Sequence, residues 1–136
     1  MNKLLASLLL AALVSGTAAA GQPADEVAQR LTAMSVKQEV AENDPRVDQT
    51  RKLLDKAVKL THEEPMAVGA ACSRYAGHLF DAIHEPATAL ELLEALATFG
   101  KSGKPMNETL QDYVAARKAV PGKSHAEAMA VLGKKK

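Results

Sequence analysis

Three side chains with metal-ligating groups stand close together in the middle of the chain. His78, Asp81 and His84 follow one another at intervals of three residues, and on a helix residues three apart share a face. Imidazole and carboxylate groups are common ligands of zinc and other transition metals. The two histidines are six residues apart, not four as in the zinc motif H-E-x-x-H, and no pair of cysteines accompanies them. A metal or small-ligand carrier is therefore the alternative interpretation, beside simple solvation of a polar helix end. We predict no resident cofactor.

The single cysteine is not placed for covalent catalysis. Cys72 lies in an apolar stripe, and on a helix His78 would lie about 120° around the axis from it. A cysteine nucleophile needs a base within hydrogen-bond reach. The motifs of serine hydrolases and of phosphate-binding loops are also missing. We therefore predict a buried thiol and no enzymatic activity. An intermolecular disulfide, and with it a homodimer, stays as an alternative.

A row of small residues accompanies that stripe. Gly69, Ser73 and Gly77 are four residues apart, and each glycine inside a helix costs about 1 kcal/mol relative to alanine. Close packing of a neighbouring helix is the favoured explanation. The other explanation is a groove kept open for a ligand or a partner helix. The predicted groove residues are Gly69, Ser73, Tyr75, Gly77 and Tyr113.

Regularly spaced prolines define the elements that carry these residues. Between them lie stretches rich in alanine and leucine, with apolar residues at helical spacing; one such stripe includes Tyr113 and Arg117. Six helices are predicted, at 24–42, 45–62, 65–84, 86–99, 106–119 and 124–132. We expect an all-α fold, a small bundle of five to six short helices with 65–84 at its centre, and an α-solenoid fragment as the less favoured arrangement.

Polar residues and glycines mark where these helices begin and end. Asp44 before Pro45 reads as an N-cap, and Ser124 with Glu127 has the spacing of a capping box. The spacing from Thr61 to Glu64 is the same. Left-handed C-terminal caps are expected at three glycines, namely Gly100, Gly122 and Gly133.

The first twenty residues are typical of a cleaved signal peptide. Lys3 precedes an apolar run, and Ala18 and Ala20 supply the small residues of an A-x-A cleavage site. We therefore predict a signal peptide over 1–20, one helical domain over 21–133, a disordered basic tail over 134–136, and a periplasmic or secreted protein. Removing 20 of the 136 residues leaves 116, with 16 basic and 16 acidic side chains. That balance argues against nucleic-acid binding, and the processed chain has no run long enough for a membrane span.

Three segments of the chain resemble a known family. Residues 72–82 (CSRYAGHLFDA), 110–114 (LQDYV) and 121–128 (PGKSHAEA) are similar to small exported helical immunity proteins. The resemblance implies a protein that binds a type VI secretion effector in the periplasm. The C-terminal cysteine of that family has no counterpart here. We thus expect an exported helical interaction protein, such as an inhibitor, immunity protein or adaptor, that binds a protein partner around helices 65–84 and 106–119.

Overall fold

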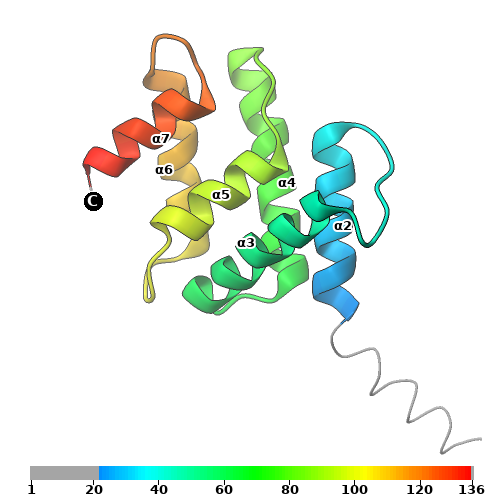
Figure 1. The fold of residues 1–136 in the computed structure, drawn as a ribbon. Helices are drawn as coiled ribbons and strands as arrows, with labels where there is room; N and C mark the ends of the chain where they lie inside the picture. The colour runs from blue at the N-terminus through cyan, green and yellow to red at the C-terminus, as the bar shows by residue number, and fades with distance from the viewer. Residues whose placement is uncertain (1–21, 136) are drawn as a thin grey trace, which may run out of the picture.

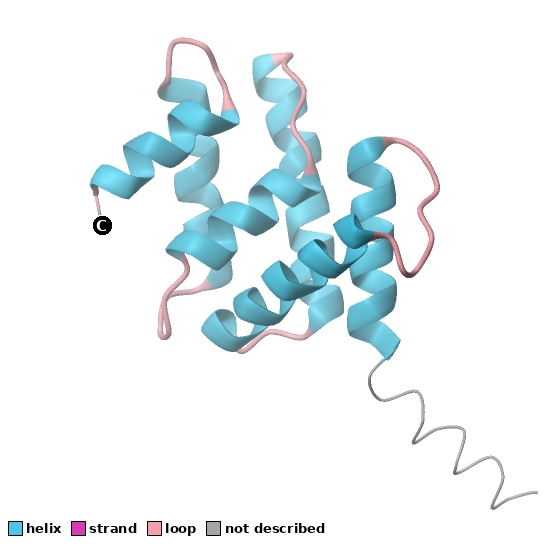
Figure 2. Cartoon of the chain, in the orientation of Figure 1, coloured by secondary structure: helices cyan, strands magenta, loops and turns pink. Residues whose placement is uncertain are grey.

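The computed structural model describes residues 22–135, so the predicted signal segment lies outside the described residues. Within this range the chain forms six α-helices and no strand (Figure 2). The prediction of an all-α helical bundle is confirmed. The helices are α2 (Gln22–Val36), α3 (Pro45–Thr61), α4 (Pro65–Ile83), α5 (Ala89–Phe99), α6 (Met106–Ala119) and α7 (His125–Lys134).

The helices stack as three successive pairs in two layers. In Figure 1, α2, α4 and α6 stand side by side, and α3, α5 and α7 cross in front of them. The main contacts run within the pairs α2–α3, α4–α5 and α6–α7, or between one pair and the next. Within the described residues, each helix of the bundle thus packs mainly on helices that are near it in the sequence. One layer, α2–α4–α6, therefore has an outer face that the other layer does not cover.

The centre of the bundle is α5, not α4. This helix contacts all five others, and six of its eleven residues are buried. Leucine and alanine occupy nearly its whole circumference, so it can be packed from every side. The expectation that 65–84 would be the central helix is wrong, because α4 keeps one face exposed. The largest fully buried apolar side chains are Leu54, Val68, Leu79, Leu92, Leu93, Leu96, Leu110 and Tyr113.

Proline and capping residues set most of the helix starts. Pro45 and Pro65 occupy the first turns of α3 and α4, and Asp44 accepts a hydrogen bond from the Arg46 amide. The Ser124 hydroxyl accepts from the Glu127 amide, as expected. The start of α5 is later than predicted, since Thr88 and Glu91 form a reciprocal capping box.

The Thr61–Glu64 capping box does not form. The Thr61 hydroxyl instead donates to the Ala57 carbonyl at 2.8 Å, inside α3. Glu64 itself becomes the N-cap position of α4, without a side-chain hydrogen bond. A hydroxyl near a helix end can bond backward or forward; here it donates backward and accepts from the Glu63 amide at 3.3 Å, not from the Glu64 amide.

The helix ends differ most from expectation. None of the three predicted glycines has a positive φ; Gly100 is extended at φ −61° and Gly133 lies inside α7. Left-handed geometry falls instead on Lys37, His62, His84 and Lys123. Helix α2 therefore ends at Val36 rather than at 42, and Val40 folds back into the core, where the Gln29 amide donates to its carbonyl.

Two further predictions concern the ends of the chain and the membrane. Helix α7 continues to Lys134, the first residue of the predicted tail. Between residues 22 and 135, none of the helices combines the length and the apolar character that crossing a bilayer requires.

Candidate functional site

The row of small residues on α4 is covered at one end and open at the other. Gly69 is buried, and a Cβ built on it would lie 2.7 Å from Val27 Cγ1 of α2. Gly77, two turns later, is exposed and would place a Cβ in open space. Ser73 between them is half-buried. Close helix packing therefore explains Gly69, but it does not explain Gly77.

A shallow groove follows the line where α2 and α4 meet. Its volume is about 210 Å³. Gly69, Ala70 and Ser73 form the α4 side, where small side chains keep the groove open. The side chains that complete the lining are Val27, Arg30, Leu31, Met34 and Met66. The groove is therefore apolar for most of its length, with one guanidinium group among its walls.

Large apolar side chains stand exposed beside this groove. Met34 on α2 is 53% exposed and Met66 on α4 is 63% exposed. Farther along α4, Phe80 is 51% exposed, beyond the open position of Gly77. Met66, Ala70, Gly77 and Phe80 all fall on one side of the helix at about 100° per residue. This apolar strip lies on the outer face of the α2–α4–α6 layer.

The two tyrosines predicted for the groove lie elsewhere. Tyr113 is fully buried on α6. Tyr75 is half-buried on the far side of α4. The Arg74 guanidinium stacks over its ring, with Cζ 5.5 Å from the ring centroid. Gln111 of α6 also donates to its hydroxyl, at 3.5 Å. The structure thus brings Gly69, Ser73 and the exposed Gly77 to one face and separates both tyrosines from them.

A buried arginine organises the opposite end of the bundle. Arg117 on α6 is only 2% exposed. Its guanidinium donates to the Lys123 carbonyl at 2.7 Å and to the Pro86 carbonyl at 3.0 Å. A third donation, at 3.1 Å, goes to the Tyr113 hydroxyl, and the Glu91 carboxylate lies 3.5 Å away. One side chain therefore joins the loop before α5 to the loop between α6 and α7.

The same network extends to a histidine. The Tyr113 hydroxyl lies 2.6 Å from His125 Nδ1, and His125 Nε2 lies 3.0 Å from the Glu94 carboxylate. Tyr113 accepts from Arg117. In the His125 tautomer that carries its proton on Nε2, the Tyr113 hydroxyl donates to Nδ1 and the Nε2–H donates to Glu94. A carboxylate, an imidazole and a hydroxyl in line are the parts of a nucleophilic triad. The Tyr113 side chain, however, is fully buried, and this burial raises the pKa of its hydroxyl to about 12. The contacts shown by the structure join α6, α7 and α5.

No family model, curated protein or solved structure matches the chain.

The three predicted metal ligands do not gather into a site. His78, Asp81 and His84 are all exposed. His84 is the left-handed C-cap of α4, and its amide donates to the Phe80 carbonyl. Among the residues that the structure describes, no three histidine, cysteine, aspartate or glutamate side chains are grouped to hold a metal ion. His62 caps α3 in the same way.

The thiol of Cys72 is shut inside the bundle. Its side chain is fully buried, and the burial raises the pKa of the thiol to about 12. A thiol that stays protonated is a poor nucleophile. The predicted inert, buried cysteine agrees with this environment.

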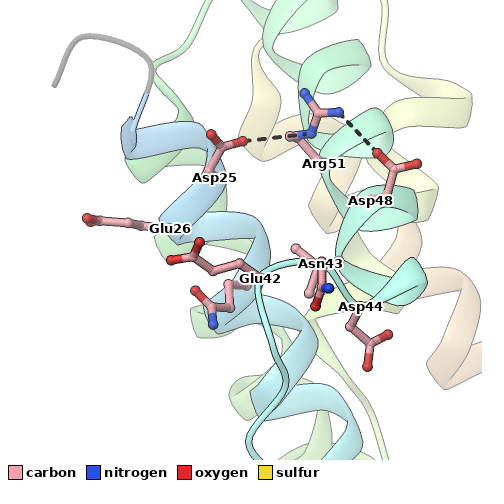
Figure 3. A pocket seen from close by; sticks show the side chains of 9 residues that line it. Asp25, Glu26, Glu42, Asn43, Asp44, Asp48 and Arg51 are labelled. Carbon is pink, nitrogen blue, oxygen red and sulfur yellow. Dashed lines mark hydrogen bonds and ion pairs between the residues drawn. The ribbon is translucent and has the colours of Figure 1, made fainter. Parts of the chain in front are cut away.

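A larger hollow than the α2–α4 groove is an acidic cleft that the sequence did not predict. It measures about 600 Å³ and lies between α2, α3 and the loop that joins them. Figure 3 shows Asp25 and Asp48 reaching Arg51, at 3.7 and 3.0 Å, while Glu26 and Asp44 extend away from it. The hydrogen bonds from Arg46 lower the pKa of Asp44 to about 2, and those from Arg51 and Lys52 lower the pKa of Asp48. These carboxylates are thus largely matched by neighbouring cations.

The arginine network could have been predicted from the sequence, whereas the acidic cleft could not. Arg117 sits at an apolar stripe position, and a charge in that place signals a buried partner. The carboxylates of the acidic cleft come from both sides of a loop that was predicted to be helix. Their convergence therefore depends on α2 ending at Val36, which the pattern did not reveal.

Proposed function

We propose that this protein is an exported helical docking protein, and that the α2–α4 groove binds an amphipathic helix of a protein partner. The observation that carries the proposal is the exposed apolar strip beside the groove, with Met34 and Met66 more than half exposed. Contiguous exposed apolar surface on a small domain usually marks an interaction site.

The shape of the groove favours a helix as the occupant. It runs between two helices and is floored by Gly69 and Ala70, whose small side chains let another backbone approach closely. A helix lying in such a groove presents apolar anchors at i, i+3 or i+4, and i+7. Methionine side chains are flexible and polarisable, so Met34 and Met66 can adapt to the anchors of a partner.

The charges beside the groove favour acidic flanks on that partner helix. Arg30 lines the groove. Its guanidinium forms no ion pair with any residue in 22–135. Complementary charges at the rim of an interface set orientation and association rate. An acidic, amphipathic helix therefore fits better than a basic one.

Export and the role of an inhibitor, immunity protein or adaptor belong to the same proposal. They rest on the signal segment and on the resemblance of residues 72–82, 110–114 and 121–128 to exported immunity proteins. The alternative, a metal carrier using His78, Asp81 and His84, has less support because those side chains do not converge.

Site-specific photo-crosslinking tests the docking surface. A photoreactive residue is placed at Met66 or Ala70, and in matched proteins at Lys56 of α3 or Lys118 of α6, which are equally exposed. The protein is expressed in its producing cell and activated there. We expect one partner crosslinked from positions 66 and 70 only, through a peptide with apolar residues at helical spacing and flanking carboxylates.

Substitutions in the groove provide the second arm. Ala70→Glu puts a charge on the groove floor and should reduce crosslinking from position 66 at least tenfold, since a buried unpaired charge costs several kcal/mol. Lys56→Glu, a charge change on another surface, should leave it unaltered. Equal crosslinking from all four positions, or a captured segment without amphipathic spacing, would show that the partner does not use this groove.

A further inference from the structure

A second hollow lies at the other end of the bundle, between α5, α6 and α7. It measures about 390 Å³, at the small end of the range of roughly 300–1,000 Å³ typical of ligand sites. Alanines of α6 and the apolar end of α7 line most of it, and lysines stand at its edge. The full lining is Phe99, Lys101, Lys104, Thr109, Asp112, Ala115, Ala116, Ala119, Val131, Leu132 and Lys135.

One polar atom beside this hollow lacks a partner. Thr109 is only 3% exposed, and its hydroxyl makes no hydrogen bond to the described residues. Among buried side-chain oxygen and nitrogen atoms of residues 23–135, it is alone in this respect. A buried hydroxyl without a partner is costly. Threonine on a helix has two favoured rotamers, so this hydroxyl can turn toward a molecule in the hollow.

Two of the three lysines that line the hollow lie at the same end of α6 as that hydroxyl, and the third, Lys135, follows α7. Lys101 and Lys104 lie in the loop that leads into α6, and Thr109 follows in its second turn. Lys104 is paired with Asp112 at 2.6 Å, whereas Lys101 forms no ion pair within the described residues. The alanines continue along α6 away from these groups. The hollow therefore offers a cationic, hydrogen-bonding end and an apolar remainder.

We propose that this hollow binds an aliphatic monocarboxylate of medium chain length. The carboxylate accepts hydrogen bonds from the Thr109 hydroxyl and the Lys101 ammonium group. The alkyl chain lies along Ala116 and Ala119 of α6 and against Leu132 of α7. The proposal is independent of the docking groove, which lies on α2 and α4.

Isothermal titration of the purified protein with sodium octanoate tests the site. We expect saturable binding with one site per chain, and at least tenfold weaker binding of 1-octanol, which lacks the charge. Each methylene from hexanoate to octanoate should tighten binding roughly fourfold.

Variants then assign the contacts. Thr109→Val keeps the shape but removes the hydroxyl, and it should weaken octanoate binding at least tenfold, since hydrogen bonds to charged groups are strong. Thr109→Ser should stay within about threefold of the wild type. Lys101→Gln should weaken binding, whereas Lys59→Gln on α3 should not. Ala119→Leu, at an exposed lining position, should block the hollow without disturbing the fold.

Two results would overturn the proposal. One is the absence of saturable octanoate binding to the folded wild-type protein, with folding verified by circular dichroism. The other is octanoate binding that Thr109→Val, Lys101→Gln and Ala119→Leu all leave unchanged, which would mean adsorption elsewhere on the chain.

Discussion

The two glycines of α4, Gly69 and Gly77, lie in different environments. Gly69 is the contact point of α4 with α2, where a methyl group would meet Val27 Cγ1 at 2.7 Å. Gly77 has open space around it. The sequence offered packing or a groove as explanations for the whole row. Packing explains Gly69, whereas Gly77 lies beyond the groove lining, which ends at Ser73. The spacing of a row does not say how far the neighbouring helix extends.

Alanine substitution separates the two cases. Gly77→Ala should raise the free energy of unfolding by about 1 kcal/mol through helix propensity alone. Gly69→Ala gains the same propensity but incurs overpacking of about 1–3 kcal/mol against a stiff β-branched side chain. We expect a net loss of about 1 kcal/mol in urea denaturation. Adding Val27→Ala should remove the clash, so non-additive energies in the double variant are the decisive readout.

Asp44 gives the stability of the protein a specific acid dependence. Its pKa is lowered from the ordinary 3.8 to about 2 by hydrogen bonds from Arg46. A lowered pKa stabilises the folded state above pH 3.8, and this contribution is lost as the pH falls through about 2. The difference in unfolding free energy between wild type and Asp44→Asn should therefore be constant above about pH 5 and shrink toward pH 2. Asp81→Asn, at an exposed carboxylate that forms no ion pair within the described residues, is the control; a pH-independent difference for Asp44→Asn would contradict the assignment.

At the scale of single elements, starts were more predictable than ends. Proline at the first helical position and a short polar side chain before it act locally, so the starts of α3 and α4 and the Ser124 cap followed from sequence. Ends depend on where packing stops the helix. The left-handed residues that end α2, α3 and α4 are a lysine and two histidines rather than glycines, so composition gave no signal. Two of the four histidines are explained as caps.

Replacing one of these caps tests that explanation. His84 has φ 56° and ψ 27°, a conformation that costs a residue with a Cβ roughly 1–2 kcal/mol. His84→Gly should raise the free energy of unfolding by about 1 kcal/mol, while His84→Ala, which keeps the Cβ, should not. Thermal or urea denaturation in the presence of a chelator measures both. If the two variants have equal stability, backbone strain at this cap is not released by glycine.

At the scale of the whole molecule, three stacked pairs hold together through neighbouring contacts. Such an architecture lets one pair open while another stays folded. Helical periodicity predicted the six helices, because each amphipathic stripe is local. It did not predict that α5 would be the central helix, nor that the apolar strip beside the docking groove would be exposed. The exposure of a helix face depends on how many other helices pack against it. The Arg117 network also joins segments far apart in sequence.

Arg117 should control the opening of the last pair. Arg117→Met removes the donors to Pro86, Lys123 and Tyr113 and leaves Glu91 without its partner. Each buried acceptor left without its donor costs about 1–3 kcal/mol. Hydrogen exchange should show the amides of α6 and α7 losing protection first, while those of α2 and α3 change much less. Uniform loss of protection across residues 22–135 would indicate that the three pairs unfold as one unit.

Because Cys72 is buried and is the only cysteine of the chain, its reactivity reports whether the core around α4 has formed. A pulse of an alkylating reagent modifies this position only in molecules whose α4 has separated from the core. In an oxidising environment the same sulfur is vulnerable just during the interval before the helices close over it. In protein isolated from an oxidising compartment, a reduced and unmodified Cys72 would therefore mean that folding was faster than oxidation.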